Sequence, residues 1–469
     1  MNKTKNEEKI ALNESRQLEK LKKIQSKGSS AFYFAVLLCL IALVNIVDEV
    51  ASNLSVTVQS SLVTEFFVNN ALFGKTYTYE EGLALHSTIG VFSYVFGLVT
   101  PFYKALADKF GRKPLFAFST FGMSLGMLIT YFSTNYIVYL IGYAVIGFFM
   151  GHDMQIIFIL EEAPKKHRAK IYSILKALGI LGVVFVPTLR SILMGNDPTL
   201  WRRIFLVPAI VGFLACLAVI VFAKDTKVYI SEKIEYLSKP LEEREREKAQ
   251  RKAEKKAQEK QYGVINAAKY IFSNSDTKAL LISHIVFDVG IAAVGLYFES
   301  CMHIAGMTTD QITKALFVLP LVYASQTFLS GFIADRIGRK KTIALASSIC
   351  VVFFILFAVG INKLWNPYLI GAFAGFYQGS FWTGRDYMNV MMTEKVPTEI
   401  RASVVGAEGL LVIIGMAVGY ILMVVGILKI PAWLMCLIVT VPSVSVAAVM
   451  LMTKVKETKG ANLEKVEVL

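Results

Sequence analysis

Two stretches of twenty residues carry acidic and basic side chains in the same order inside largely apolar sequence. The first, "GHDMQIIFILEEAPKKHRAK", begins at Gly151, and the second, "GRDYMNVMMTEKVPTEIRAS", begins at Gly384, which is 233 residues later (384 − 151 = 233). A carboxylate or imidazole in apolar surroundings can bind and release a proton, and an arginine can hold a carboxylate or phosphate with two parallel hydrogen bonds. The duplicated pattern therefore predicts a site for protons or for a polar solute.

Each stretch places a basic–acidic pair, His152–Asp153 or Arg385–Asp386, well inside an apolar run. Each aspartate stands eight residues before a glutamate, and eight helical residues rise about 12 Å. We therefore expect both pairs near the centre of a bilayer. Neighbouring residues on a helix point about 100° apart, so one member of each pair should face a central cavity and the other a neighbouring helix.

Other ionisable residues also fall inside apolar runs, where each costs about 2.5–3.5 kcal/mol on insertion scales and is therefore a functional candidate. The substrate-site and proton-site candidates are Asp48, Glu49, His152, Asp153, Arg190, Asp288, Arg385 and Asp386. The four aspartates are expected either to carry protons or to form permanent ion pairs. The two arginines are expected either to hold an anionic solute or to neutralise a nearby carboxylate. His284, one turn from Asp288, either relays a proton or packs as a hydrogen-bonded side chain.

Helices that cross a membrane must position these residues. The chain has 469 residues, of which 55% are hydrophobic and 18% charged, with a mean hydropathy of +0.54; soluble proteins carry about 25% charged residues. Runs of about 20 apolar residues span a bilayer only as helices. The sequence thus predicts an all-α polytopic membrane protein with twelve transmembrane helices. The expected spans are 31–54, 85–107, 115–133, 136–160, 169–194, 203–223, 278–301, 312–333, 342–361, 367–392, 402–427 and 432–453.

Lysine and arginine gather in alternate gaps between these spans, which places both termini in the cytoplasm. The net charge of +14 follows from this topology, so we expect no nucleic-acid partner. Two tandem six-helix bundles joined by a charged helical linker follow from the span pattern. The expected parts are an N-terminal tail (1–29), a first bundle (30–223), a cytoplasmic linker (224–277), a second bundle (278–453) and a C-terminal tail (454–469).

Loop motifs repeat along with the spans: "ADKFGRK" at 107–113 recurs as "ADRIGRK" at 334–340. With these motifs the chain resembles a major facilitator superfamily transporter. The E-x-x-P-x-x-x-R pattern, which begins at Glu161 and Glu394, and "LWRRIFLVPA" at 200–209 are similar to the metabolite:proton symporter and sugar porter branches. The resemblance implies two halves that rock about a central site.

Charged residues near the ends of the spans are expected to latch the two halves together while the cytoplasmic side is closed, the alternative being simple stiffening of loops. The gate and latch candidates are Asp108, Arg112, Glu161, Arg168, Lys176, Asp335, Arg339, Glu394, Arg401 and Glu408. Among them, Lys176 and Glu408 are expected to form a gate ion pair between two spans.

The predicted function is a proton-coupled secondary active transporter that takes up a small polar organic metabolite, either an organic anion or a sugar-like molecule. The alternatives are a proton-coupled exporter of organic cations or drugs, and a non-transporting membrane sensor. The sequence has no phosphate-binding GxxxxGK[ST] motif and no metal-ligand cluster, so we expect no enzyme activity, no cofactor and no metal. The expected partners are the solute, protons and the lipid bilayer. We expect a monomer in the cell membrane, namely a bacterial inner membrane.

Overall fold

The computed structural model describes residues 2–26, 30–72, 74–92, 110–150, 158, 161–163, 168–240, 243–244, 246–247, 249–250, 263–397 and 400–459. Within these ranges the chain is almost entirely helical, and β pairing is limited to one isolated bridge between Leu72 and Lys75. The predicted all-α class is therefore confirmed.

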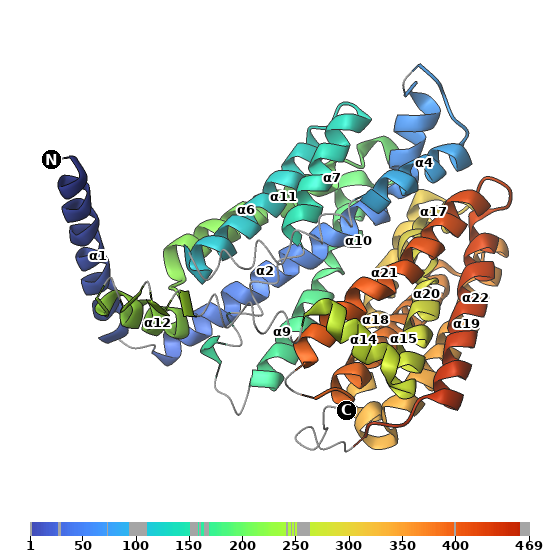
Figure 1. Cartoon of the computed structure of the whole chain (residues 1–469). Helices are drawn as coiled ribbons and strands as arrows, with labels where there is room; N and C mark the ends of the chain where they lie inside the picture. Colours follow the sequence, from blue (N-terminus) through green and yellow to red (C-terminus); the bar gives the residue numbers. More distant parts are fainter. Residues whose placement is uncertain are drawn as a thin grey trace.

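The first half of the bundle, drawn from blue to green in Figure 1, is built from helices α2 to α11. They are α2 (Ala31–Thr57), α3 (Gln59–Val63), the π-helix η1 (Thr64–Asn69), α4 (Tyr79–Phe92), α6 (Arg112–Tyr131), α7 (Tyr136–Met150), α9 (Arg168–Gly182), α10 (Phe185–Leu189), the π-helix η3 (Arg190–Met194), the short 3₁₀ helix η4 (Pro198–Leu200) and α11 (Arg203–Phe222).

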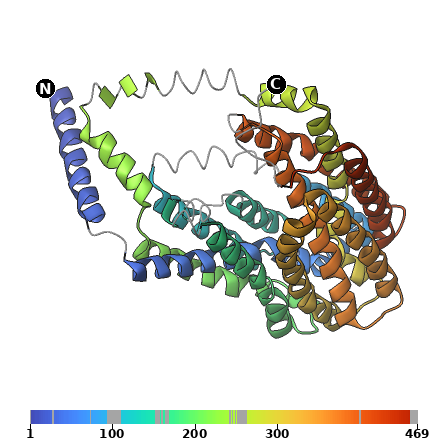
Figure 2. The same cartoon turned by 90° about the horizontal axis from the view of Figure 1, so that it is seen from below.

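The second half, drawn from yellow to red, lies beside the first. It comprises α15 (Ser275–Asp288), α16 (Ile291–Leu296), α17 (Phe298–Ile304), α18 (Thr309–Ile337), α19 (Arg339–Asn362), α20 (Pro367–Glu394), α21 (Arg401–Gly426) and α22 (Ala432–Lys454). Three further helices lie outside the two halves: α1 (Asn2–Ser26), α12 (Lys227–Ser238) and α14 (Val264–Ser273). Helices α1 and α12 pack against each other and stand apart from the second half (Figures 1 and 2).

Seven of the described helical segments are long and apolar enough to cross a membrane. They are Ala31–Thr57, Arg112–Tyr131, Pro198–Phe222, Thr309–Ile337, Arg339–Asn362, Ser403–Gly426 and Ala432–Lys454. Their outer surfaces expose large apolar side chains such as Leu214 (61%) and Ile421 (63%). A soluble protein avoids broad apolar surfaces, whereas lipid accommodates them. The chain is therefore a multi-pass membrane protein. Residues 93–107 of the second expected span and residues 151–157 and 159–160 of the fourth lie outside the described residues.

The fifth and seventh expected spans are not continuous helices, contrary to the sequence prediction. The fifth breaks after Gly182, and the seventh breaks after Asp288 and again after Leu296. The first expected span, 31–54, lies within the continuous helix α2. A break frees backbone N–H and C=O groups that a membrane cannot hydrogen-bond. In the first half a break lies just beyond the first expected span, where α2 ends at Thr57 and α3 begins at Gln59. Broken helices in corresponding places of two halves are typical of the interior sites of transporters.

The buried apolar residues form two clusters with different extents. The larger cluster joins both halves, since it contains Leu54 and Phe67 together with Val294, Tyr297 and Met423. The smaller cluster, which includes Leu37, Phe116, Phe158, Leu175 and Val219, belongs to the first half alone. We call the end of the bundle that carries the starts of α6 and α19 the motif end. The first half thus packs against the second at the opposite end and has a core of its own at the motif end.

Candidate functional site

A buried ion pair lies inside the second half. Asp288, the last residue of α15, is fully buried, and Arg385 of α20 donates from Nε to both of its carboxylate oxygens at 3.1 Å. The Arg385 guanidinium also lies over the Trp382 ring, 5.6 Å from its centroid. A charge-assisted contact of this kind compensates much of the cost of burying both charges. Of the two alternatives for Arg385, the structure thus places it on a carboxylate.

The ion pair continues into a second pair of titratable groups. His284 lies one turn before Asp288, with Nε2 3.8 Å from Asp288 Oδ1. On its other side, His284 Nδ1 is 2.9 Å from Glu408 Oε1 on α21. His284 and Glu408 are 0% and 1% exposed, and neither His284 Nε2 nor Glu408 Oε2 makes a hydrogen bond. We call Arg385, Asp288, His284 and Glu408 the ionisable chain.

Glu408 was expected to pair with Lys176 as a gate, but the structure places its carboxylate on His284 instead. The side chain of Lys176 lies outside the described residues. The reason for the difference is geometric: α15 packs directly against α21, so a residue of the same half reaches Glu408.

The other acidic candidates that the structure describes differ in their exposure. Asp386 is exposed, whereas Asp48 and Glu49 on α2 are partly buried. Glu49 packs against α9, because a Cβ atom added to Gly179 would lie 3.4 Å from Glu49 Cγ. His152 and Asp153 lie outside the described residues, so the duplicated pair of the first half cannot be set beside Arg385–Asp386.

At the end opposite the motif end, a second buried network joins the two halves. Glu299 of α17 accepts from Ser60 N at 2.8 Å and from Ser60 Oγ at 2.6 Å. Arg190, the first residue of η3, lies with Nη1 3.5 Å from Glu299 Oε1. Both charged side chains are no more than 1% exposed. We call these three residues the closure network.

The broken helices explain why the closure network forms. Ser60 is the second residue of α3, so its N–H has no partner within that helix, and Glu299 accepts from it. The carbonyl of Thr57, freed where α2 ends, accepts from Arg190 Nη1. Arg190 Nε donates to Thr313 Oγ1 of the second half at 2.9 Å. Arg190 is therefore bound on both sides by protein groups, and its guanidinium is not open to a solute in this conformation.

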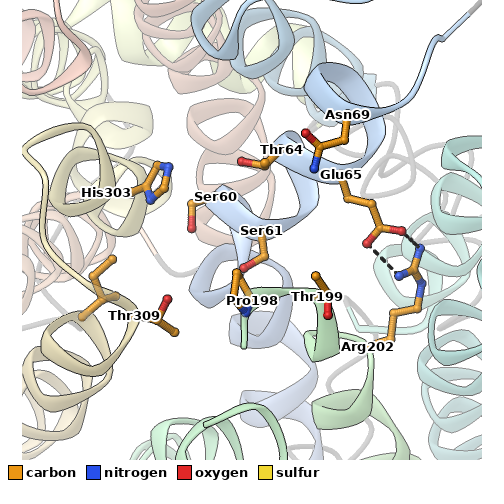
Figure 3. A pocket seen from close by; sticks show the side chains of 11 residues that line it. Ser60, Ser61, Thr64, Glu65, Asn69, Pro198, Thr199, Arg202, His303 and Thr309 are labelled. Atoms are coloured by element: carbon orange, nitrogen blue, oxygen red, sulfur yellow. Dashed lines mark hydrogen bonds and ion pairs between the residues drawn. The ribbon is translucent and has the colours of Figure 1, made fainter. Parts of the chain in front are cut away.

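A polar cavity of about 330 Å³ lies just outside the closure network (Figure 3). Ser60, Ser61 and Thr64 line it from the first half, and His303 and Thr309 line it from the second. Glu65 and Arg202 form an ion pair at one wall, with Arg202 Nη2 2.6 Å from Glu65 Oε1. Ser60 belongs both to the wall of this cavity and to the closure network.

At the motif end of the first half, Arg112 begins α6 and pairs with Glu161 at 3.0 Å. Thr226, which follows α11, donates its hydroxyl to the same carboxylate. Asp225 Oδ1 accepts from Lys113 N at 2.9 Å and so caps the start of α6. Gly111 precedes the helix with φ +104°, and a Cβ atom there would lie 2.8 Å from Asp225 Oδ1. Glycine is thus required at Gly111 both by the backbone and by the capping carboxylate.

The second half repeats this arrangement. Arg339 lies 3.3 Å from Glu394, and Thr458 Oγ1 donates to Glu394 at 2.5 Å. Glu457 accepts from Arg339 N and Lys340 N at 3.0 and 3.1 Å. Asp335, 79% exposed, adds a contact to Arg339 Nη1 at 3.4 Å. Each half therefore ties the start of its third helix to the loop after its sixth.

The latch prediction is corrected in one respect. The pairs Arg112–Glu161 and Arg339–Glu394 each lie within a single half, so they stiffen a half instead of joining the two. Arg401 donates to the Val396 carbonyl at 3.1 Å, which is also within its half. Asp108 and the side chain of Arg168 lie outside the described residues.

Sequence reasoning missed Glu299 and the residues that follow α11 and α22. The signal for the latter was present: "KDTK" at 224–227 recurs as "KETK" at 456–459, an offset of 232 residues (456 − 224 = 232). Glu299 gave no such signal, because it has no acidic counterpart in the other half and only the fold brings it to Ser60.

These features define a polytopic helical membrane protein of two similar halves with ionisable groups in its interior. A family model of the Major Facilitator Superfamily matches residues 60–407 and 280–468, and the chain belongs to that superfamily.

Two curated relatives and one solved structure illustrate the range of similarity. The organic cation/carnitine transporter 6 of Arabidopsis thaliana is 25% identical over 356 residues, which are 70% of this chain and 65% of that protein. The minor myo-inositol transporter IolF of Bacillus subtilis (strain 168) is 24% identical over 317 residues, 65% of this chain and 66% of that protein. The chain thus matches slightly less than two thirds of either relative.

The crystal structure of a D-xylose-proton symporter has the same fold, with a TM-score of 0.65 at 15% identity over 92% of this chain and 99% of that one. At this identity the likeness shows the fold alone.

Proposed function

We propose that the chain is a proton-coupled secondary active transporter of a small polar organic metabolite, working by symport and alternating access. In this proposal two halves of six membrane-spanning helices each (30–223 and 278–453) rock about a central site. The motif end and both termini lie in the cytoplasm, and the protein sits in a cell membrane, namely a bacterial inner membrane. It works as a monomer.

The single observation that carries the proposal is the ionisable chain. With Arg385 charged, Asp288 and Glu408 ionised and His284 neutral, the formal charges sum to −1 (+1 − 1 − 1 + 0). One added proton brings the sum to zero, which an apolar interior tolerates better than a net charge. Four ionisable groups, with Asp288, His284 and Glu408 fully buried, are therefore suited to hold one proton and release it.

The atoms of His284 indicate where that proton would reside. An ionised Glu408 only accepts, so neutral His284 donates Nδ1–H to it and turns the lone pair of Nε2 toward Asp288. Protonation of Nε2 makes an imidazolium that bridges two carboxylates and competes with Arg385 for Asp288. Arg385 is adjacent in sequence to the exposed Asp386. A shift of Arg385 on proton binding would therefore move Asp386 and alter the proposed central solute site.

The closure network supports the alternating-access part of the proposal. It joins the halves at one end, while the first half keeps a separate apolar core at the motif end. Opening toward the other side of the membrane requires Arg190–Glu299 and the Ser60 hydrogen bonds to break together. Breaking a buried ion pair costs several kcal/mol, so the network favours the conformation that is closed at this end.

Of the two proposed substrate classes, the contacts favour the sugar-like one. An organic anion needs an open cation, yet Arg385 is bound to Asp288 and Arg190 lies against Glu299 and Thr313. A neutral polyhydroxylated solute needs only hydroxyl and amide partners.

The test is uptake into proteoliposomes, with the solute first chosen as the one that raises the melting temperature of the purified protein most. We expect an inwardly directed proton gradient to accelerate uptake several-fold. Glu408→Gln should abolish this acceleration while solute exchange without a gradient persists, because the solute site is left intact. Uptake by the unaltered protein that ignores the gradient would refute proton coupling. A loss of exchange in Glu408→Gln would instead place Glu408 at the solute.

A second candidate function, proton-coupled export of an organic cation, is favoured by the exposed carboxylate of Asp386 and by the similarity to an organic cation/carnitine transporter. Under this function only cations should raise the melting temperature, and Asp386→Asn should remove the effect. Stabilisation by neutral sugars that survives in Asp386→Asn would exclude it.

A further inference from the structure

The motif end of the first half contains a cavity of about 200 Å³ that has no part in the proposed transport cycle. Its walls come from four segments: the end of α1, the start of α2, Glu162, and the loop 224–226 with the start of α12. Gln25 of α1 donates to Ser231 of α12 at 3.3 Å and closes one side.

One wall carries a carboxylate oxygen that is left unsatisfied. Glu162 is 9% exposed; its Oε1 accepts from Lys227 N at 2.6 Å, whereas its Oε2 is buried and makes no hydrogen bond. The Lys227 ammonium is 3.7 Å from Oε2, and its own side chain is 58% exposed. Oε2 therefore has an ion-pair partner but no hydrogen bond. A buried carboxylate oxygen without a hydrogen bond is costly, so an added N–H donor would stabilise it.

The second half has a different chemical group at the position equivalent to Glu162. The residue 233 positions after Glu162 is Lys395 (162 + 233 = 395), and its side chain is 8% exposed. Lys395 Nζ binds Asp276 and also donates to the Lys456 carbonyl at 2.8 Å. The second half thus fills the equivalent corner with an ammonium of its own, while the first half has a carboxylate and a cavity there.

The other groups that line the cavity are also suited to a ligand that carries an ammonium group. Asp225, which also lines the cavity, contributes a second carboxylate. Tyr33 accepts from Lys224 N at 2.9 Å, and Lys224 Nζ lies over the Tyr33 ring, 4.8 Å from its centroid. The two lysines flank the cavity, so a ligand with a hydroxyl or carboxylate beside its ammonium would meet partners at both ends.

We propose that this cavity is a binding site for a small primary ammonium compound, whose N–H groups donate to Glu162 Oε2. The site is separate from the ionisable chain and from the solute path. Because Asp225 and Lys227 flank Thr226, which is bound to Glu161, an occupant would also hold the loop that ties α6 in place.

The probes are ethanolamine and choline, which share a hydroxyethyl arm and a positive charge but differ in that choline has no N–H. At pH 7.5 and millimolar concentration, ethanolamine should raise the melting temperature of the purified full-length protein, and choline should have at most a small effect. Glu162→Gln should remove the response to ethanolamine, while Glu232→Gln, an exposed control on α12, should keep it.

Ser231→Phe provides a second route, because it fills the cavity without touching the carboxylate, and it should also remove the response. Equal responses to both probes, or a full response in Glu162→Gln, would overturn the proposal. A response that persists in Ser231→Phe but not in Glu162→Gln would move the site away from this cavity and would equally contradict it.

Discussion

The motif ends of the two halves have the same arrangement of charged groups, but the buried charges of the second half have more hydrogen-bond and ion-pair partners than those of the first. Both tie an arginine at the start of the third helix to a glutamate and a threonine: Arg112 with Glu161 and Thr226, and Arg339 with Glu394 and Thr458. They differ where Glu162 of the first half corresponds to Lys395 of the second. The arrangement of helix ends is thus retained while the charge at one corner is inverted, and the inverted corner is where a cavity lies.

The carboxylates that cap the third helix of each half, Asp225 and Glu457, also differ, and again the charge of the second half is the better stabilised. Burial raises the pKa of Asp225 above its ordinary value, with backbone hydrogen bonds opposing that effect. Burial also acts to raise the pKa of Glu457, but hydrogen bonds from the N–H groups of Lys459, Thr458, Arg339 and Lys340 outweigh it and hold that pKa below its ordinary value. The second half therefore stabilises its capping charge better than the first.

The largest expected difference between the halves follows removal of the partly buried glutamates Glu161 and Glu394. Glu161→Gln removes the carboxylate that pairs with Arg112, whose side chain is only 8% exposed, and should cost about 2–3 kcal/mol. Glu394→Gln should cost about 1 kcal/mol, because the Arg339 side chain is 21% exposed and water can hydrate its charge. Thermal unfolding in detergent would measure both, and equal losses would show that burial does not separate the two halves.

The second largest difference in stability is expected at the equivalent positions Glu162 and Lys395, which carry opposite charges. Lys395→Met removes the ammonium from Asp276 and from the Lys456 carbonyl, leaving Asp276 the Lys456 N–H at 2.8 Å, and should lower stability by about 1–2 kcal/mol. Glu162→Gln keeps an acceptor for Lys227 N and relieves an unsatisfied charge, so its effect should stay within about 0.5 kcal/mol. A larger loss of stability in Glu162→Gln than in Lys395→Met would mean that Glu162 has the stronger interactions, which would contradict the contacts seen in the structure.

The capping carboxylates should give a smaller contrast. Glu457→Gln weakens four backbone hydrogen bonds at an exposed position and should cost about 1 kcal/mol, while Asp225→Asn should cost about half as much. Hydrogen exchange at the first turns of α19 and α6 would locate each loss, and the α19 amides should exchange faster only in Glu457→Gln. Faster exchange in both helices from either variant would mean that the caps act through the whole bundle.

The smallest expected effect is the pH dependence of these caps. The pKa of Asp225 is raised on folding, so its contribution is most favourable below its unfolded pKa and is lost as the pH rises. The pKa of Glu457 is lowered, so its contribution is present above its unfolded pKa and is lost as the pH falls through the folded value. The quantity to compare is the melting temperature of the unaltered protein minus that of each variant. On acidification from pH 7 to about pH 4, this difference should increase for Asp225→Asn and decrease for Glu457→Gln. Parallel trends in the two variants would contradict the opposite shifts.

The sequence by itself determined the all-helical membrane class, the superfamily, and the duplication that pairs Arg112 with Arg339 and Glu161 with Glu394. These follow from local properties: the length of apolar runs, the absence of water in a bilayer, and motifs repeated at nearly constant offsets. The recurrence of "KDTK" as "KETK" was equally visible in the sequence, although the sequence prediction did not use it.

Only the tertiary structure decided which charges meet in the interior. Arg385 binds Asp288, Glu408 binds His284, and Arg190 meets Glu299. The sequence had suggested Lys176 as the partner of Glu408 and had named no particular carboxylate for either arginine. The physical reason is that a buried charge takes the nearest group that satisfies it, and that group lies on a neighbouring helix whose packing and breaks no periodicity encodes. The closure of the two halves at Ser60 and Glu299 is likewise a property of broken helices that meet, not of any motif.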